Sequence, residues 1–314
     1  MKKLTLPELA IALLRGDNYI ILTHRRPDGD TIGCAAALTR GLRNLGKQAA
    51  ILENPQFTGK YRPYLEGLTV EQLPENSTLV SVDIATEGLF PFSATDYVNQ
   101  VTLLIDHHDR NTEFAEGGYI DPAAACGEII LELLQTMDAP MDKEIAEALY
   151  VAISTDTGCF RYSNVTANTL RAAAFCKDWG ADTFAINRAM FMTKRLSRLK
   201  LDAHLTQTTE FFAGGKVAIS TISDEIRREL GITPDDIDDI SGFGREIEGV
   251  EVGVMLRCEG EYGKISVRTS PNYDACAICA CVGGGSNYGG LIAPWMADKL
   301  QGKNEHIRFI AVES

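Results

Sequence analysis

The chain has 314 residues, enough for two domains of ordinary size, and its hydrophobic content of 45% is that of a globular protein. Its formal net charge is −13, from 43 acidic and 30 basic residues, so the surface field repels long polyanions and excludes long duplex nucleic acid as the main partner. Eight scattered cysteines indicate a reducing, cytoplasmic location, and the absence of an apolar run of about 18 residues argues against secretion and a membrane partner.

Residues 19 to 106 alternate apolar runs with helical segments. The runs YIILTH, QAAILE, TLVSVD and VTLLID each predict a buried strand, and the residues between the first two predict a helix from Thr31 to Leu45. Continuous apolar strands that are separated by helices form parallel sheets covered on both faces. The pattern therefore predicts an α/β fold, with a doubly wound parallel-sheet domain at the N-terminus.

The remainder of the chain is predicted to be helical first and mixed afterwards. Amphipathic patterns predict helices over Cys126–Met137 and Lys143–Ser154, followed by a long connecting helix. Beyond Gly214 and Gly215, the segments KVAISTIS, EVGVMLRCE and KISVRTS alternate with period two and predict a smaller mixed-sheet α/β domain. The predicted parts are a catalytic domain at 1–184, a connecting helix at 185–213 and a substrate-binding domain at 214–314.

The first chemical motif is THRRPDGD at residues 23–30. An apolar strand ends there in His24, and Asp28 and Asp30 stand at the start of the following helix. Ligands of an open α/β sheet gather at the carboxyl ends of its strands, where helix N-termini also favour phosphate. The motif is therefore a candidate for metal and phosphate chemistry.

Three further motifs repeat this placement. Asp83 ends the strand VSVD, Asp106 ends LLID and is followed by His107 and His108, and Asp156 stands at the end of an apolar helix. A lone aspartate at such a place is more often a helix cap than a metal ligand. Independent caps need no histidines, however, and the chain has only five histidines in total. We therefore predict that these motifs form one site.

Carboxylates and imidazoles without a cysteine suit hard or borderline cations, so Mn²⁺ is the expected metal and Mg²⁺ the alternative. So many ligands cannot all surround one ion that also keeps room for substrate. They predict two ions about 3.5–4 Å apart that share one carboxylate and a hydroxide. The predicted centre is dinuclear.

These motifs resemble those of the DHH phosphoesterase superfamily. HRRPDGD, VSVD, IDHHDRN and STDTG match its four motifs in order, and SVRTS with CVGGGSNYGG is similar to its DHHA1 domain. The length and layout resemble the branch of oligoribonucleases (nanoRNases) and pAp phosphatases. The resemblance implies an N-terminal DHH domain that binds metal and a C-terminal DHHA1 domain that binds substrate.

The resemblance also implies a role for each motif residue. The implied ligands are His24 and Asp28 on the first ion, Asp30, His107 and Asp156 on the second, and Asp83 on both. Asp106 would orient the neighbouring imidazole, and His108 would face the scissile phosphate. With Asp106, the two histidines of this motif are the residues expected to act in catalysis.

Substrate contacts are implied in the second domain. Arg268 matches the family arginine that holds a substrate phosphate, a task that suits the two-pronged guanidinium. A glycine loop lets backbone approach the nucleotide, and this chain has Ser286 or Asn287 where the family commonly has histidine. The residues expected to touch substrate are His108, Arg268, Gly283, Gly284, Gly285, Ser286 and Asn287.

Two other features are expected to be structural. Cys34 stands where the family has serine or another small residue, an exchange expected to leave the chemistry unchanged. The acidic run DDIDD at 235–239 is expected to be a solvated loop or helix start rather than a metal site.

The sequence therefore predicts a phosphoesterase that hydrolyses short oligoribonucleotides (nanoRNA, dinucleotides), 3′-phosphoadenosine 5′-phosphate (pAp), or both, by a two-metal hydroxide mechanism. One alternative is a phosphodiesterase of linear or cyclic dinucleotide second messengers. Another is a nucleotide-binding regulatory protein without catalysis, although no motif acid or histidine is missing. The sequence carries almost no information on oligomeric state, and a homodimer is compatible with it.

Overall fold

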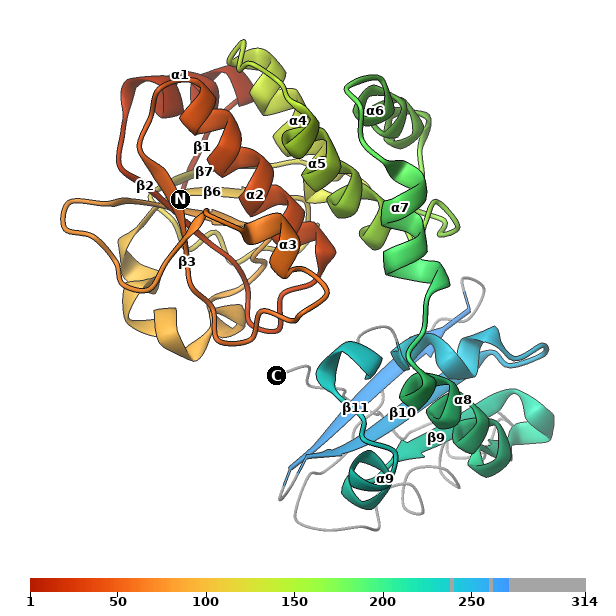
Figure 1. Ribbon diagram of the computed structural model, residues 1–314. Coiled ribbons are helices and arrows are strands. Elements are labelled where there is room, and N and C mark those ends of the chain that lie inside the picture. Colours follow the sequence, from red (N-terminus) through yellow and green to blue (C-terminus); the bar gives the residue numbers. More distant parts are fainter. Residues whose placement is uncertain (238–239, 260–261, 271–314) are drawn as a thin grey trace. The chain divides into compact units, whose positions relative to one another are not determined.

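The computed structural model (Figure 1) describes residues 1–237, 240–259 and 262–270. The chain divides into two compact units, and the division falls between Thr193 and Lys194. The first unit contains a seven-stranded sheet and the second a four-stranded sheet. None of the helices in the described ranges has both the length and the apolar character that crossing a membrane requires.

All strand pairs in the first sheet are parallel, which confirms the predicted fold class. The strand order is β1-β7-β6-β5-β2-β3-β4. From β2 the chain winds outward through β3 and β4, and from β5 it winds in the opposite direction, so the topological switch point lies between β2 and β5. The strands are β1 (Lys2–Lys3), β2 (Tyr19–Leu22), β3 (Ala49–Leu52), β4 (Thr69–Val70), β5 (Thr78–Val82), β6 (Val101–Asp106) and β7 (Gly117–Ile120).

Both faces of this sheet are buried. Alternate strand residues, such as Tyr19 and Ile21 of β2, join a core with the long helices, whereas Ile20 and Leu22 join a second core beneath short 3₁₀ turns. Those turns span Glu87–Leu89 and Phe92–Gln100. The helices of the first unit are α1 (Leu6–Arg15), α2 (Gly29–Asn44), α3 (Arg62–Leu65), α4 (Cys126–Thr136), α5 (Lys143–Asp156), α6 (Ala167–Asp178) and α7 (Thr183–Asn187).

Helices α2 and α5 approach each other closely (Figure 1). A Cβ atom on Gly33 of α2 would collide with the carbonyl oxygen of Ala148 on α5. A glycine is therefore needed at this crossing, and its tight contact is with a neighbouring helix. The crossing positions two helices that each carry a candidate ligand, Asp30 and Asp156.

The connection predicted as one helix over 185–213 is divided in the structure. Helix α7 continues into a π-helical turn at Arg188–Met192, Thr193 is extended, and a separate helix α8 begins at Leu196 and ends at Thr208. Residues 210–212 form a strand. At the break, Arg195 donates to the buried carboxylate of Asp236, a residue far away in the sequence.

The second sheet is mixed, as predicted. Strands β9 and β10 pair in parallel, whereas β8 with β9 and β10 with β11 are antiparallel. The three strands predicted after Gly215 correspond to β9, β10 and β11. The elements are β8 (Glu210–Phe212), β9 (Val217–Ile222), α9 (Asp224–Glu229), β10 (Val252–Glu259) and β11 (Tyr262–Thr269), with 3₁₀ turns at Ala213–Gly215, Pro234–Ile237 and Ile240–Glu246.

Candidate metal centre

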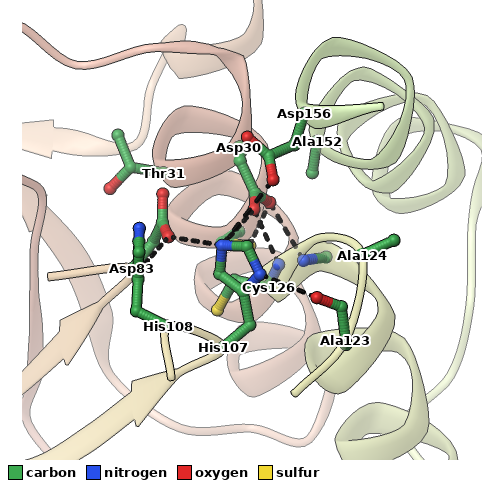
Figure 2. Close-up of polar contacts among 12 residues, drawn as sticks. Asp30, Thr31, Asp83, His107, His108, Ala123, Ala124, Cys126, Ala152 and Asp156 are labelled. Carbon is green, nitrogen blue, oxygen red and sulfur yellow. Dashed lines mark hydrogen bonds and ion pairs between the residues drawn. The ribbon is translucent and has the colours of Figure 1, made fainter. Parts of the chain in front are cut away.

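The candidate ligands predicted from separate motifs converge at the switch point of the first sheet. Their side chains fall into three overlapping groups, and within each group the candidate ligand atoms lie within 4.8 Å of one another. Figure 2 shows the part of the cluster between α2, β5, β6 and α5. The groups are His24, Asp28 and Asp83; Asp30, His107 and Asp156; and Asp83, His107 and His108.

His24 and Asp28 lie on either side of a turn that joins β2 to α2. Nε2 of His24 is 3.5 Å from Oδ1 of Asp28 and 3.7 Å from Oδ2 of Asp83. Nδ1 of His24 donates to the carbonyl oxygen of Arg25 at 2.8 Å, which leaves Nε2 as the coordinating nitrogen. Asp28 also caps α2, because its Oδ1 accepts from the backbone N–H groups of Asp30 and Thr31.

The pKa values of His24 and Asp28 are shifted in opposite directions. Burial opposes the charged imidazole, but the carboxylates of Asp28 and Asp83 and the Arg25 carbonyl raise the pKa of His24 to about 9. Burial likewise opposes the charge of Asp28, yet His24 and the helix N–H groups lower its pKa to about 2. Asp28 is thus held as a carboxylate, the form that binds a cation.

Asp83 faces His24 of the first set and His107 of the second. Its φ angle is 57°, a left-handed conformation that aspartate tolerates better than most residues and that is common at functional sites. The side chain is buried, and its Oδ1 has no hydrogen-bond donor among the described residues, although Nε2 of His107 lies 3.4 Å away. A buried carboxylate oxygen without a donor is costly unless a cation binds it.

Asp30 has two sets of contacts. Its carboxylate accepts from the backbone N–H groups of Cys126 at 2.6 Å and Gly127 at 2.9 Å, so it caps α4 from the neighbouring helix α2 (Figure 2). Oδ2 also lies 3.8 Å from Nε2 of His107. Cys34, expected to be a small structural residue, is fully buried and donates its thiol to Oδ1 at 3.2 Å.

His107 connects Asp30 with Asp156. Its Nδ1 donates to the carbonyl oxygen of Ala123 at 2.9 Å, and its Nε2 lies 3.7 Å from Oδ2 of Asp156 (Figure 2). The hydrogen bond to Ala123 directs Nε2 into the cluster. Asp156 stands at the C-terminus of α5, where the helix dipole disfavours a negative charge and a bound cation would offset it.

Burial, reinforced by mutual repulsion, raises the pKa values of the carboxylates in the second set. Burial and the neighbouring carboxylates of Asp83 and Asp156 raise the pKa of Asp30 well above its usual value. Burial, with Asp28 and Asp83, raises the pKa of Asp156 to about 7. The pKa of His107 rises to about 11, because Asp83 and Asp30 outweigh the effect of its burial. So many carboxylates in one buried place fit a divalent cation better than any structural role.

Asp106 does not join the converging ligands but holds His108. Its Oδ1 accepts from Nδ1 of His108 at 2.8 Å, and its Oδ2 accepts from Nδ2 of Asn111 at 2.6 Å. Asn111 also donates to the carbonyl oxygen of Ile84, directly after Asp83. The hydrogen bond that His108 donates to Asp106 raises the pKa of His108, whose side chain is about half exposed.

Apart from His108, only one of the predicted substrate contacts, Arg268, lies among the described residues. Arg268 is exposed on β11 of the second unit, and its guanidinium donates to the carbonyl oxygen of Val267 at 3.2 Å. The glycines at 283–285, Ser286 and Asn287 lie outside the described residues.

The sequence reasoning missed residues that hold the ligands in place. Asn111 could have been predicted, because it belongs to the motif IDHHDRN. Asn54 and the Ala123 carbonyl gave no signal, since each acts on a residue far away in the sequence.

Residues 18–153 match the DHH family, N-terminal domain. The bifunctional oligoribonuclease and PAP phosphatase NrnA of Thermus thermophilus is 31% identical over 290 residues, which cover 91% of this chain and 86% of that protein. The chain belongs to the DHH family. Its family membership and its cluster of acids and histidines identify this DHH protein as a phosphoesterase.

Two other similarities extend the comparison of this DHH phosphoesterase. The cyclic-di-AMP phosphodiesterase PdeA of Listeria monocytogenes is 25% identical over 291 residues, which cover 83% of this chain and 40% of that protein. The crystal structure of an exopolyphosphatase-related protein from Bacteroides fragilis superimposes with a TM-score of 0.82 at 19% identity, covering 94% of this chain and 97% of that one. The latter shares the fold.

Proposed function

We propose that this DHH phosphoesterase hydrolyses short oligoribonucleotides and pAp with the aid of two divalent ions. The observation that carries the proposal is that Asp83, at the switch point of the sheet, faces His24 of one ligand set and His107 of the other. The substrate class follows from the similarity to the T. thermophilus oligoribonuclease and PAP phosphatase, of which the chain covers 86%. A short substrate also suits a protein whose net charge is −13.

The proposed ligands divide between the two ions. His24 and Asp28 hold the first ion, and Asp30, His107 and Asp156 hold the second. Asp83 bridges them, a role supported by its two oxygens, since Oδ2 lies 3.7 Å from His24 and Oδ1 lies 3.4 Å from His107. Mn²⁺ is the first choice for this mixture of carboxylate and imidazole, and Mg²⁺ is the second. When bound, such ions lower the pKa of water and neutralise charge on the phosphate.

The remaining residues of the proposal act on the substrate. His108 has its Nδ1 occupied by Asp106, so its Nε2 is available to hydrogen-bond a phosphate or leaving-group oxygen. The raised pKa of His108 favours the form that donates a proton. In the second unit, Arg268 holds a terminal phosphate, and the glycine loop at 283–285 with Ser286 and Asn287 contacts the nucleotide.

The test is hydrolysis by the metal-free protein after Mn²⁺ is added. Release of mononucleotide from a 5′-phosphorylated dinucleotide, and of phosphate from pAp, should both require the metal and stop with a chelator. Asp83→Ala is the control, because it removes the bridging carboxylate. If the wild type releases no more product than Asp83→Ala from either substrate, the proposed function is wrong.

A second candidate is hydrolysis of dinucleotide second messengers, which the similarity to the L. monocytogenes cyclic-di-AMP phosphodiesterase favours. The chain spans 40% of that protein's length, so the similarity concerns only part of it. Product analysis separates the candidates. Faster turnover of cyclic di-AMP than of linear pApA and pAp would make the cyclic dinucleotide the substrate.

A further inference from the structure

The chain turns sharply between His24 and Asp28. Arg26, in the middle of the turn, has a φ angle of 51°, which a residue with a long side chain rarely adopts. The turn brings Oδ1 of Asp28 within 3.5 Å of Nε2 of His24. A backbone of this kind persists only where surrounding contacts hold it.

Two side chains from the segment after β3 supply those contacts. Asn54 donates through Nδ2 to the carbonyl oxygen of His24 at 3.0 Å and to Oγ1 of Thr23 at 3.3 Å. Oε1 of Gln56 accepts from the backbone N–H of Arg26 at 3.0 Å. The N–H of Gln56 donates to Oδ1 of Asn54, also at 3.0 Å, so the two side chains act together. We call this pair the Asn54–Gln56 clamp.

Among the described residues, the hydrogen bonds of the clamp reach one of the two ligand sets, the one that contains His24. Asn54 is 1% exposed, so its hydrogen bonds are shielded from water, and a lost donor would leave a buried carbonyl oxygen unpaired. The second set has different supports, namely the N–H groups of Cys126 and Gly127 and the Ala123 carbonyl. In the sheet, β3 lies on the opposite side of β2 from β5.

We propose that Asn54 is a positioning residue for the first metal ion, because it fixes the backbone of His24 at the spacing that His24 and Asp28 need. The inference rests on the proposed two-metal function. Groups that orient metal ligands typically change metal affinity about 10- to 100-fold when they are removed. Loss of the Asn54 donor should therefore lower the affinity for one metal ion by that factor and leave the affinity for the other unchanged.

The experiment is a calorimetric titration of the metal-free full-length protein with Mn²⁺, together with thermal unfolding of the metal-free form. Asn54→Asp is the informative variant, since it keeps the oxygen that accepts from Gln56 but replaces the donor facing His24 with oxygen. Asn44→Ala is the matched control, because the Asn44 amide makes similar bonds to Pro140 and Asp142 away from the cluster. It should bind two ions as the wild type does.

The expected result is one ion bound with wild-type affinity and one bound about 10- to 100-fold more weakly by Asn54→Asp. Equal weakening of both ions, or no change in either, would overturn the inference. If Asn54→Asp fails to fold, Gln56→Ala provides the test, and it should lower the affinity for one ion and leave the other unchanged. A wild type that binds fewer than two ions refutes the proposed function itself, which is a separate outcome.

Discussion

Two acidic residues of the cluster contact both a helix N-terminus and a histidine. Asp28 caps α2 and Asp30 caps α4, although both also face the histidines of the candidate metal centre. The sequence presents capping and metal binding as alternatives for such aspartates. In the structure the two are compatible, because a carboxylate has several lone pairs and can accept from N–H groups while facing a cation.

Asp83 differs from these two because its buried Oδ1 has no hydrogen-bond donor in the described chain. We predict that Asp83→Asn lowers hydrolysis at least about 100-fold, since the amide bridges two ions poorly. The metal-free variant should be as stable as the metal-free wild type, or more stable by about 1 kcal/mol, because the substitution removes a carboxylate whose burial opposes its charge and raises its pKa. Urea denaturation in the presence of a chelator measures this, and clear destabilisation would contradict the prediction.

A substitution of His108 can show whether this residue acts in catalysis or binds a metal ion. It belongs to one of the three ligand groups, yet its Nδ1 is engaged by Asp106. We predict that His108→Ala lowers kcat by about 10²–10⁴-fold, the usual contribution of a proton-transferring side chain. Both Mn²⁺ affinities should stay the same in a titration. Loss of a bound ion would instead make His108 a ligand.

The elements that carry most of the cluster were predictable from local patterns. The strands β2, β3, β5 and β6 and the helices α2, α4 and α5 follow the apolar runs in the sequence. Strand β7 was missed because it begins with two glycines. Gly118 is needed there, since a Cβ would lie 2.6 Å from the carbonyl oxygen of Leu104 on the adjacent strand. Such a requirement depends on packing and leaves no periodic signal.

The acidic run at 235–239 is a second place where long-range contacts were not predictable from local sequence. It was expected to be a solvated loop or helix start, and a 3₁₀ turn does span Pro234–Ile237, while residues 238 and 239 lie outside the described residues. Asp236, however, is 3% exposed and accepts from Arg195, Ser197 and Thr233. Arg195 is 41 residues away in the sequence. Local composition therefore indicates a polar surface where a long-range network has formed. The Asn54 contact with His24, 30 residues away, escaped prediction for the same reason.

The crossing of α2 and α5 gives a prediction at the scale of elements. Gly33→Ala would push α2 away from the Ala148 carbonyl, and overpacking of this kind costs about 1–3 kcal/mol. Because α2 carries Asp30 and α5 carries Asp156, the second metal ion should bind more weakly and the first should change less. Calorimetric titration with Mn²⁺ and urea denaturation measure the two effects.

Gly88→Ala is the matched control for this glycine. A Cβ at Gly88 would meet only Oγ1 of Thr86 at an ordinary 3.8 Å, so stability and metal binding should not change. If Gly33→Ala behaves like Gly88→Ala, the close crossing does not position the second ion.

At the scale of the whole molecule, the two units have separate cores. Buried residues of the first unit form clusters on both faces of its sheet, and the second unit has its own cluster around Leu201, Leu205 and Met255. All the candidate metal ligands lie in the first unit. A ligand that binds only the folded form of one unit should stabilise that unit selectively.

We therefore predict two thermal transitions for the metal-free full-length protein, of which Mn²⁺ raises only one. At a free Mn²⁺ concentration about 100 times the dissociation constant, each bound ion contributes about 2.7 kcal/mol. For a unit of this size that corresponds to a shift of roughly 5–10 °C. Differential scanning calorimetry measures the shift, which Asp83→Asn should abolish.

Leu201→Ala, which removes a fully buried side chain from the second core, should lower the other transition and leave the Mn²⁺ shift intact. A single transition that Mn²⁺ and Leu201→Ala both move would mean that the two units unfold together, because the separate cores would then be energetically coupled.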